Sequence, residues 1–150
     1  MNSAVVWGAL AVAALNALAA LYGAWCWRRG GQSRVFWLLL RVGQAAVLVD
    51  VIAVGVLAAA GHYSSDRLFY LYALLPVPVA FIAEQFRAAS AQSILDQRRL
   101  EGASSVASQP EAEQRAIVVA VLHREMGVMA LSAAVVVFLA LRAAATAHGF

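Results

Sequence analysis

Four long apolar stretches separated by short polar segments dominate the pattern of this chain. They cover about residues 4–27, 35–60, 68–86 and 122–145. A helix that rises ~1.5 Å per residue needs roughly 20 residues to cross a hydrocarbon core of ~30 Å, so each stretch is about long enough to span a membrane. We therefore predict an all-α polytopic membrane protein, in which four transmembrane helices form a bundle and residues 1–150 make a single domain.

Two prolines, Pro76 and Pro78, stand near the middle of the third stretch. A proline inside a helix has no amide donor and clashes with the carbonyl four residues earlier, so we expect a kink there. The carbonyls of Tyr72 and Leu74 lose their helical donors and become hydrogen-bond acceptors near the centre of the membrane.

The segment between the third and fourth stretches, residues 87–121, is polar but rich in helix-forming residues. Ser108 followed by Glu111 matches a capping box, and Pro110 suits the first turn of a helix. A helix running over 109–145 would be about 55 Å long, more than a membrane needs. We expect the third and fourth helices to extend from the membrane as an antiparallel hairpin. The alternative is a separate amphipathic helix on the membrane surface.

The composition supports the membrane interpretation and disfavours a water-soluble domain. The chain is 63% hydrophobic and 13% charged, with a mean hydropathy of +0.77, whereas an average soluble domain is about 25% charged. The net charge is +3 and every basic residue apart from histidine is an arginine. Most arginines flank the apolar stretches, which fits membrane orientation better than binding to nucleic acid.

The distribution of arginines predicts the orientation in the membrane. Three arginines follow the first stretch and four follow the third, whereas only Arg67 follows the second. The positive-inside rule therefore places both termini outside and the hairpin in the cytoplasm. The alanine-rich, lysine-free composition is typical of a high-GC bacterial coding sequence, so we expect the bacterial plasma membrane, which is the inner membrane of a cell that has two.

Asp50 is the most informative polar residue within the stretches, because a carboxylate is costly in hydrocarbon and usually faces the interior of a bundle. Counting from the outer ends of the helices places Asn16 and Pro78 at the same depth. We predict an intramembrane polar centre made of Asp50, Asn16 and the helix break at Pro76 and Pro78. It is either a proton, cation or ligand site in which Asp50 titrates, or a protonated carboxyl that only bonds a neighbouring helix.

Charged residues near the cytoplasmic ends of three helices are predicted to form an interfacial network. Arg41 is nine residues from Asp50, on the opposite face of its helix, so it cannot pair with that carboxylate. We expect it either to extend its guanidinium to the membrane surface or to meet acids on neighbouring helices and lock the helices together. The predicted members are Arg41, Glu84, Arg87, His123, Arg124 and Glu125.

His62, Tyr70 and Tyr72 outline a candidate ligand pocket near the outer surface. Haem b would need two axial ligands at one depth, which His62 and His148 alone could supply. We predict no bound cofactor, with haem b or a quinone as the alternative. We also predict no metal site, because no ligand spacing typical of one is present. Most tryptophans and tyrosines fall near the ends of the stretches, as in an aromatic belt.

No glycine-rich phosphate loop and no serine nucleophile elbow occurs in the sequence, which disfavours an enzyme. We expect a non-enzymatic accessory or scaffold subunit, or a homo-oligomer, whose cytoplasmic hairpin contacts a protein partner. The first alternative is a small proton- or ion-coupled transporter or channel that uses Asp50. The second is an electron carrier that binds haem or a quinone.

Overall fold

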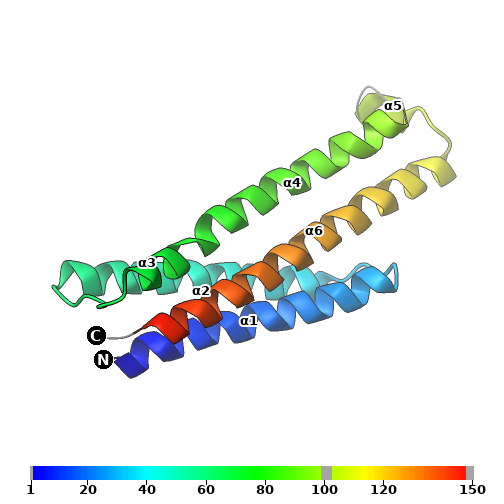
Figure 1. Cartoon of the computed structure of the whole chain (residues 1–150). Helices are drawn as coiled ribbons and strands as arrows, with labels where there is room; N and C mark the ends of the chain where they lie inside the picture. Colours follow the sequence, from blue (N-terminus) through cyan, green and yellow to red (C-terminus); the bar gives the residue numbers. More distant parts are fainter. Residues whose placement is uncertain (1, 99–102, 148–150) are drawn as a thin grey trace.

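The computed structural model describes residues 2–98 and 103–147, and all regular elements in these residues are helices. They are α1 (Asn2–Arg28), α2 (Arg34–Ala59), α3 (Arg67–Leu74), α4 (Pro76–Gln97), α5 (Ala103–Ala107) and α6 (Glu111–Thr146). The start of α1 and the end of α6 lie at the same end of the molecule (Figure 1).

Four helical segments are long and apolar enough to cross a membrane, as predicted. They are Ser3–Arg28, Arg34–Ala59, Arg67–Gln97 and Glu111–Thr146. The third consists of α3 and α4, which follow one another along a bent path (Figure 1). The all-helical class and the four apolar helices expected from the sequence are therefore confirmed.

The break between α3 and α4 lies at the first of the two prolines. α3 ends at Leu74 and α4 begins at Pro76, with Leu75 between them in a helical conformation. The Leu75 amide still donates to the Leu71 carbonyl (3.0 Å). Pro76 and Pro78 have no amides to donate to the carbonyls of Tyr72 and Leu74, so the helical ladder is interrupted at two positions and the path bends there.

The last helix begins without the predicted capping box. α6 starts at Glu111 and no side chain caps it. The hydroxyl of Ser108 donates to the carbonyl of Ser105 (2.8 Å), so it serves the turn after α5 and not α6. Gln114 reaches back instead, and its Nε2 donates to the carbonyl of Gln109 (2.7 Å).

Past the end of α1, α4 and α6 continue side by side, joined by α5 (Figure 1). The rings of Trp27 and His123 stack with centroids 5.5 Å apart, which marks the level on α6 at which α1 ends. At about that level, Arg124 Nη1 donates to Ser93 Oγ (3.2 Å). We call the parts at and beyond this level, residues 91–97, 103–107 and 111–122, the α4–α6 extension.

α1 packs between α2 and α6, and glycines bring these helices close together. A Cβ atom added to Gly23 would lie 2.4 Å from Phe36 Cε2 and 3.0 Å from Ala130 Cβ. A Cβ atom on Gly127 would lie 2.9 Å from Trp27 Nε1. Such small residues favour helix association in lipid, because they let backbones approach and make van der Waals contact.

Three buried clusters follow one another along the helices. The cluster beside the α1–α2 turn is centred on Phe36, Leu40 and Met129, each at most 1% exposed. A middle cluster combines residues of α1, α2 and α6, namely Val12, Ala13, Val47, Val136 and Ala140. The third lies near the chain ends and contains Val5, Ala9, Val54, Phe69, Ala73, Ala143 and Ala147.

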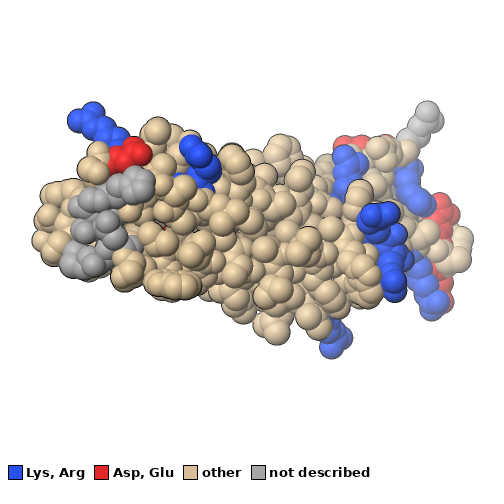
Figure 2. Space-filling view, turned by 60° about the horizontal axis from the view of Figure 1, so that its bottom comes forward, with Lys and Arg blue, Asp and Glu red and all other residues tan. Residues whose placement is uncertain are grey.

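Large apolar side chains are also abundant on the outside of the molecule. Leu21, Val49, Ile52, Phe81 and Leu131 are each more than half exposed. On the face shown in Figure 2, charged side chains gather toward the two ends and the middle is mostly uncharged. Such a surface suits a lipid environment far better than water.

We expect Gly23→Ala to lower the free energy of unfolding by about 1–3 kcal/mol, because its methyl group would collide with the buried Phe36 ring. Gly55→Ala is the matched control, since Gly55 has no such neighbour within 4 Å. The control should be neutral or stabilising by up to about 1 kcal/mol. Unfolding in a mild detergent, followed by circular dichroism, measures both; equal loss of stability would contradict the packing described.

Candidate functional site

Ion pairs centred on Glu84 connect three helices near the end where α1 turns into α2. Glu84 Oε1 on α4 lies 3.0 Å from Arg41 Nη1 on α2. Its Oε2 lies 3.2 Å from Arg87 Nη1 on α4, and Arg87 Nε lies 3.9 Å from Glu125 Oε2 on α6. Two carboxylates and two guanidinium groups therefore compensate one another across α2, α4 and α6.

Two further residues belong to this charge network and were missed in the sequence. Gln44 Oε1 accepts a hydrogen bond from Arg41 Nη1 (2.8 Å), and Gln44 Nε2 donates to Glu84 Oε1 (3.5 Å). The Arg87 guanidinium lies 5.4 Å from the centre of the Trp37 ring. Both residues share a helix face with Arg41, three residues after it and four before it, and this spacing could have identified them.

The structure does not place His123 and Arg124 in the network. His123 stacks on Trp27, and Arg124 donates to Ser93. Consecutive residues of a helix point about 100° apart, so His123, Arg124 and Glu125 face three different neighbours. Of the six predicted members, the structure brings together Arg41, Glu84, Arg87 and Glu125.

The charge network closes one end of a cleft between α2 and α4 of about 270 Å³. Apart from Gln85, the other side chains that line this cleft are apolar, among them Val47, Leu48, Val77 and Phe81. The ion pairs at this end of the cleft connect α2, α4 and α6. The role of a structural lock stays a prediction from the sequence, which the Glu84 substitution below tests.

Asn16 is buried at the interface of α1 and α2. Its Nδ2 donates to the carbonyl of Val12 (2.9 Å) on its own helix and to that of Gly43 (3.3 Å) on α2. A Cβ atom on Gly43 would lie 2.9 Å from Asn16 Oδ1, so the glycine makes room for the amide. Asn16 thus fixes the alignment of α1 with α2.

The structure does not bring Asp50 to Asn16. Asp50 lies opposite Gly8, where a Cβ atom would be 2.7 Å from Asp50 Oδ1. Asn16 lies opposite Gly43, which precedes Asp50 by seven residues, or about 10 Å along the axis of α2. The predicted register was counted from the outer ends of the apolar stretches, and it is in error by about two turns. Counting from the short turn at 29–33 would have come closer, because that turn ties the two helices together.

Asp50 lies in a cleft of about 280 Å³ between α1 and α2, which we call the α1–α2 cleft. Its other described lining residues are uncharged: Ala4, Val5, Gly8, Ala11, Val12, Ala46, Val49, Ala53, Val54 and Leu57. Within the described part of the chain the Asp50 carboxylate makes no hydrogen bond or ion pair. Pro76 and Pro78 do not line this cleft, and Val77 between them faces the cleft on the α4 side of α2.

The three members of the predicted ligand pocket do not converge. His62 is exposed in the turn after α2. The hydroxyl of Tyr70 accepts a hydrogen bond from the Ser64 amide (2.9 Å), and the ring of Tyr72 faces the Arg142 guanidinium at 5.3 Å.

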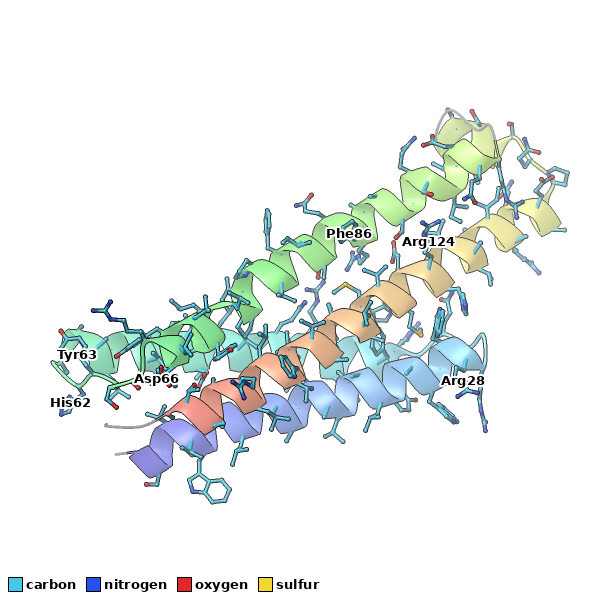
Figure 3. All side chains as sticks on the ribbon, viewed as in Figure 1. Arg28, His62, Tyr63, Asp66, Phe86 and Arg124 are labelled. Atoms are coloured by element: carbon cyan, nitrogen blue, oxygen red, sulfur yellow. The ribbon has the colours of Figure 1, made fainter. Side chains whose placement is uncertain are left out.

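The histidines are widely separated in the residues that the structure describes. His62 lies at one end of the molecule, and Arg124, the neighbour of His123, lies toward the other (Figure 3). His148 lies outside the described residues. Among residues 2–98 and 103–147, no group of three or more histidine, cysteine, aspartate and glutamate residues is placed to hold a metal ion. The predicted absence of a bound cofactor stays a prediction, with haem b or a quinone as its alternative.

Arg142 was overlooked because the arginines were counted in the connecting segments. It lies within the last apolar stretch, on an exposed face of α6. Its guanidinium contacts the Tyr72 ring but no carboxylate among the described residues. The argument that singles out Asp50, a charge within an apolar helix, would have identified it as well.

We expect Glu84→Gln to lower the free energy of unfolding by about 1 kcal/mol, because it leaves Arg41 and Arg87 without a shared carboxylate. Glu111→Gln serves as the control, since its pair with Arg115 is highly exposed. The control should change stability by less than about 0.5 kcal/mol. Chemical unfolding in detergent at low and high salt measures both variants, and an equally small effect would argue against a structural lock.

Comparisons with known proteins assign no family to the chain. No family model, no curated protein and no solved structure matches it.

Proposed function

We propose that the chain is an integral protein of the bacterial plasma membrane, with four spans packed as a bundle. The four apolar helices and the uncharged middle of the surface support this. Most arginines lie toward the α4–α6 extension, which supports a cytoplasmic extension and extracytoplasmic termini by the positive-inside rule. The surrounding lipid would cover the exposed leucine, valine and phenylalanine side chains.

Within that membrane we propose a non-enzymatic accessory or scaffold subunit that binds a protein partner through the α4–α6 extension. The observation that carries this function is an apolar groove of about 360 Å³ beyond the end of α1. The hairpin groove, as we call it, is lined by Ala91, Leu95, Val106, Ile117, Val118, Val121 and Leu122. An apolar groove between two helices fits the apolar face of a partner helix.

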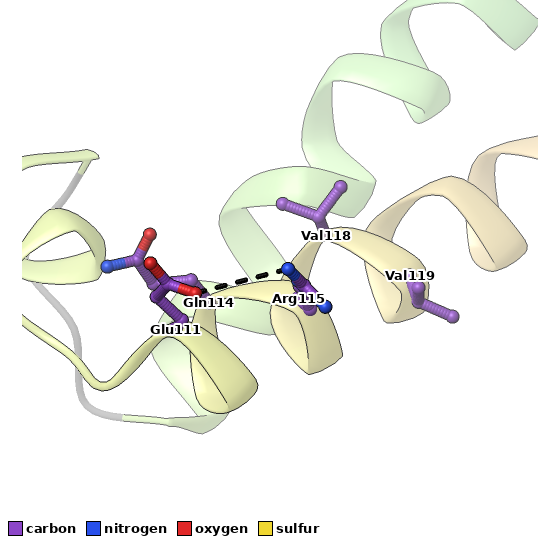
Figure 4. A pocket seen from close by; sticks show the side chains of 5 residues that line it. All are labelled: Glu111, Gln114, Arg115, Val118 and Val119. Carbon is purple, nitrogen blue, oxygen red and sulfur yellow. Dashed lines mark ion pairs between the residues drawn. The ribbon is translucent and has the colours of Figure 1, made fainter.

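The charged side chains around the hairpin groove indicate that this part of the molecule lies in water and not in the membrane interior. Arg98 Nη1 lies 3.6 Å from Glu113 Oε1 across α4 and α6. At the start of α6, Arg115 Nη2 lies 3.9 Å from Glu111 Oε2, close to Val118 (Figure 4). An apolar groove that is exposed to water and flanked by charged pairs is typical of a surface that binds a partner protein. Since the charges are of both signs, apolar contact would provide most of the affinity.

The two alternative functions find less support in the geometry. Transport through one copy needs polar groups along a path, but Asp50 and Asn16 occupy separate places and the α1–α2 cleft is otherwise apolar. Haem binding needs two axial ligands at one level, but of the candidate pair His62 is exposed in the turn after α2 and His148 lies outside the described residues. The accessory function needs only the extension and its groove.

A photo-crosslinking amino acid at Val118 should give a discrete adduct with a second protein in native membranes, because this side chain lines the hairpin groove. Ala116 is the matched control, since it is exposed on another face of the same helix and does not line the groove. Leu122→Arg should remove the adduct at Val118. Mass spectrometry identifies the adducts; only lipid adducts, or the same adducts from both positions, would contradict a partner in the groove.

Purified protein in liposomes should show no proton flux that depends on Asp50. We expect the parent chain and Asp50→Asn to give equal, background rates with a pH-sensitive dye inside the liposomes. Flux that is present in the parent and lost in Asp50→Asn would favour the transporter over the accessory subunit.

A further inference from the structure

We infer, on the basis of the membrane insertion proposed above, that Arg142 of one copy enters the α1–α2 cleft of a neighbouring copy and pairs with Asp50. Each copy would then carry Asp50 on one face and Arg142 on another. The interface would repeat from copy to copy within the membrane.

Both charges lack an ionic partner among the described residues of their own chain. Asp50 makes no ion pair in the described residues, and neither does Arg142, whose guanidinium rests on the Tyr72 ring. A lone charge within an apolar span is costly, and such residues usually pair with one another. Two opposite charges without partners in one molecule therefore point to pairing between molecules.

The two charges lie at about the same level along the helices. Asp50 is opposite Gly8, and Ala9 packs in one cluster with Ala143, the neighbour of Arg142. Copies inserted in one orientation meet only at equal depth in the membrane. Arg142 of one copy is thus at the correct depth for Asp50 of the next.

The shapes of the two faces are also complementary. α6 presents an exposed ridge of side chains that follow one another at intervals of four and three residues. The ridge consists of Leu131, Val135, Phe138, Arg142 and Ala145. The α1–α2 cleft presents small residues, with Ala46 and Ala53 on either side of Asp50 along α2. α2 and α6 run in the same direction (Figure 1). Aligning Arg142 with Asp50 therefore places Phe138 against Ala46 and Ala145 against Ala53.

The two faces belong to different sides of the molecule. The cleft lies between α1 and α2, whereas Arg142 lies beside α3 on α6. An interface between two different surfaces is heterologous, so it continues into a ring or an open row and does not stop at a dimer. If another protein with a basic helix, or a cationic lipid, occupied the cleft instead, the cross-linking experiment below would give no ladder of copies.

Cysteine cross-linking in native membranes tests the alignment. The background is Cys26→Ser, which removes the single cysteine of the chain. Ala53→Cys combined with Ala145→Cys should form disulfides under mild copper–phenanthroline oxidation and give a ladder of dimers, trimers and larger species. Ile52→Cys combined with Ala145→Cys is the matched control, since Ile52 is exposed next to Ala53 but does not line the cleft. No ladder, or equal ladders for the two pairs, would overturn the interface.

Charge reversal tests the ion pair itself. Asp50→Arg and Arg142→Asp should each reduce cross-linking by at least about tenfold, because each places like charges together. Co-expression of these two variants with different tags should restore cross-links between the tags, since every interface between alternating copies again joins opposite charges. Failure of this rescue, with both variants folded by circular dichroism, would overturn the pairing.

The result separates this interface from the proposed partner function. Photo-crosslinking at Val118 should be unchanged in Asp50→Arg and Arg142→Asp, because the hairpin groove lies at the other end of α6. A normal adduct without any ladder would reject the self-assembly alone. Release of the chain from membranes by alkaline carbonate would reject both, because each depends on membrane insertion.

Discussion

The close approach of α1 to α2 and α6 is the constraint on which the rest of the structure depends. At four levels a glycine on one helix receives a side chain from a neighbour: Asp50 at Gly8, Phe36 at Gly23, Asn16 at Gly43 and Trp27 at Gly127. In lipid the burial of apolar surface gives little drive for helices to associate, so the fit of such contacts decides which helices pair and in which register. That register sets the level of every polar group.

The other side of α2 is held differently. α2 and α4 enclose a cleft, and Glu84 joins them through Arg41 and Gln44 at one end of it. On this side the helices are connected by directional, charge-assisted hydrogen bonds, whereas on the α1 side they are connected by packing. The two modes are complementary, because close packing fixes register and ion pairs near a membrane surface fix which helix ends meet.

Features that depend on one helix at a time could be predicted from the sequence. Backbone groups in lipid must be bonded within the helix, so hydropathy identifies the four apolar helices. The chemistry of Pro76 likewise gives the place of the break. Features that depend on two helices were less accessible: the alignment of Asn16 with Gly43 follows from how side chains interlock, which no periodicity reveals. Helix geometry alone predicts that His123 and Arg124 point in different directions. The predicted network included both because they are neighbours in the sequence, and the difference in direction was overlooked.

The contrast between the unbroken α6 and the interrupted pair α3 and α4 has a mechanical consequence. α6 is one helix of 36 residues, whereas its neighbour is divided at Pro76. A force applied to the start of α6 would tilt it as a stiff lever and reach its far end, while α4 could swing about the proline as a hinge. Movement imposed on the start of α6 would thereby be delivered to the opposite end of the molecule by a single rod.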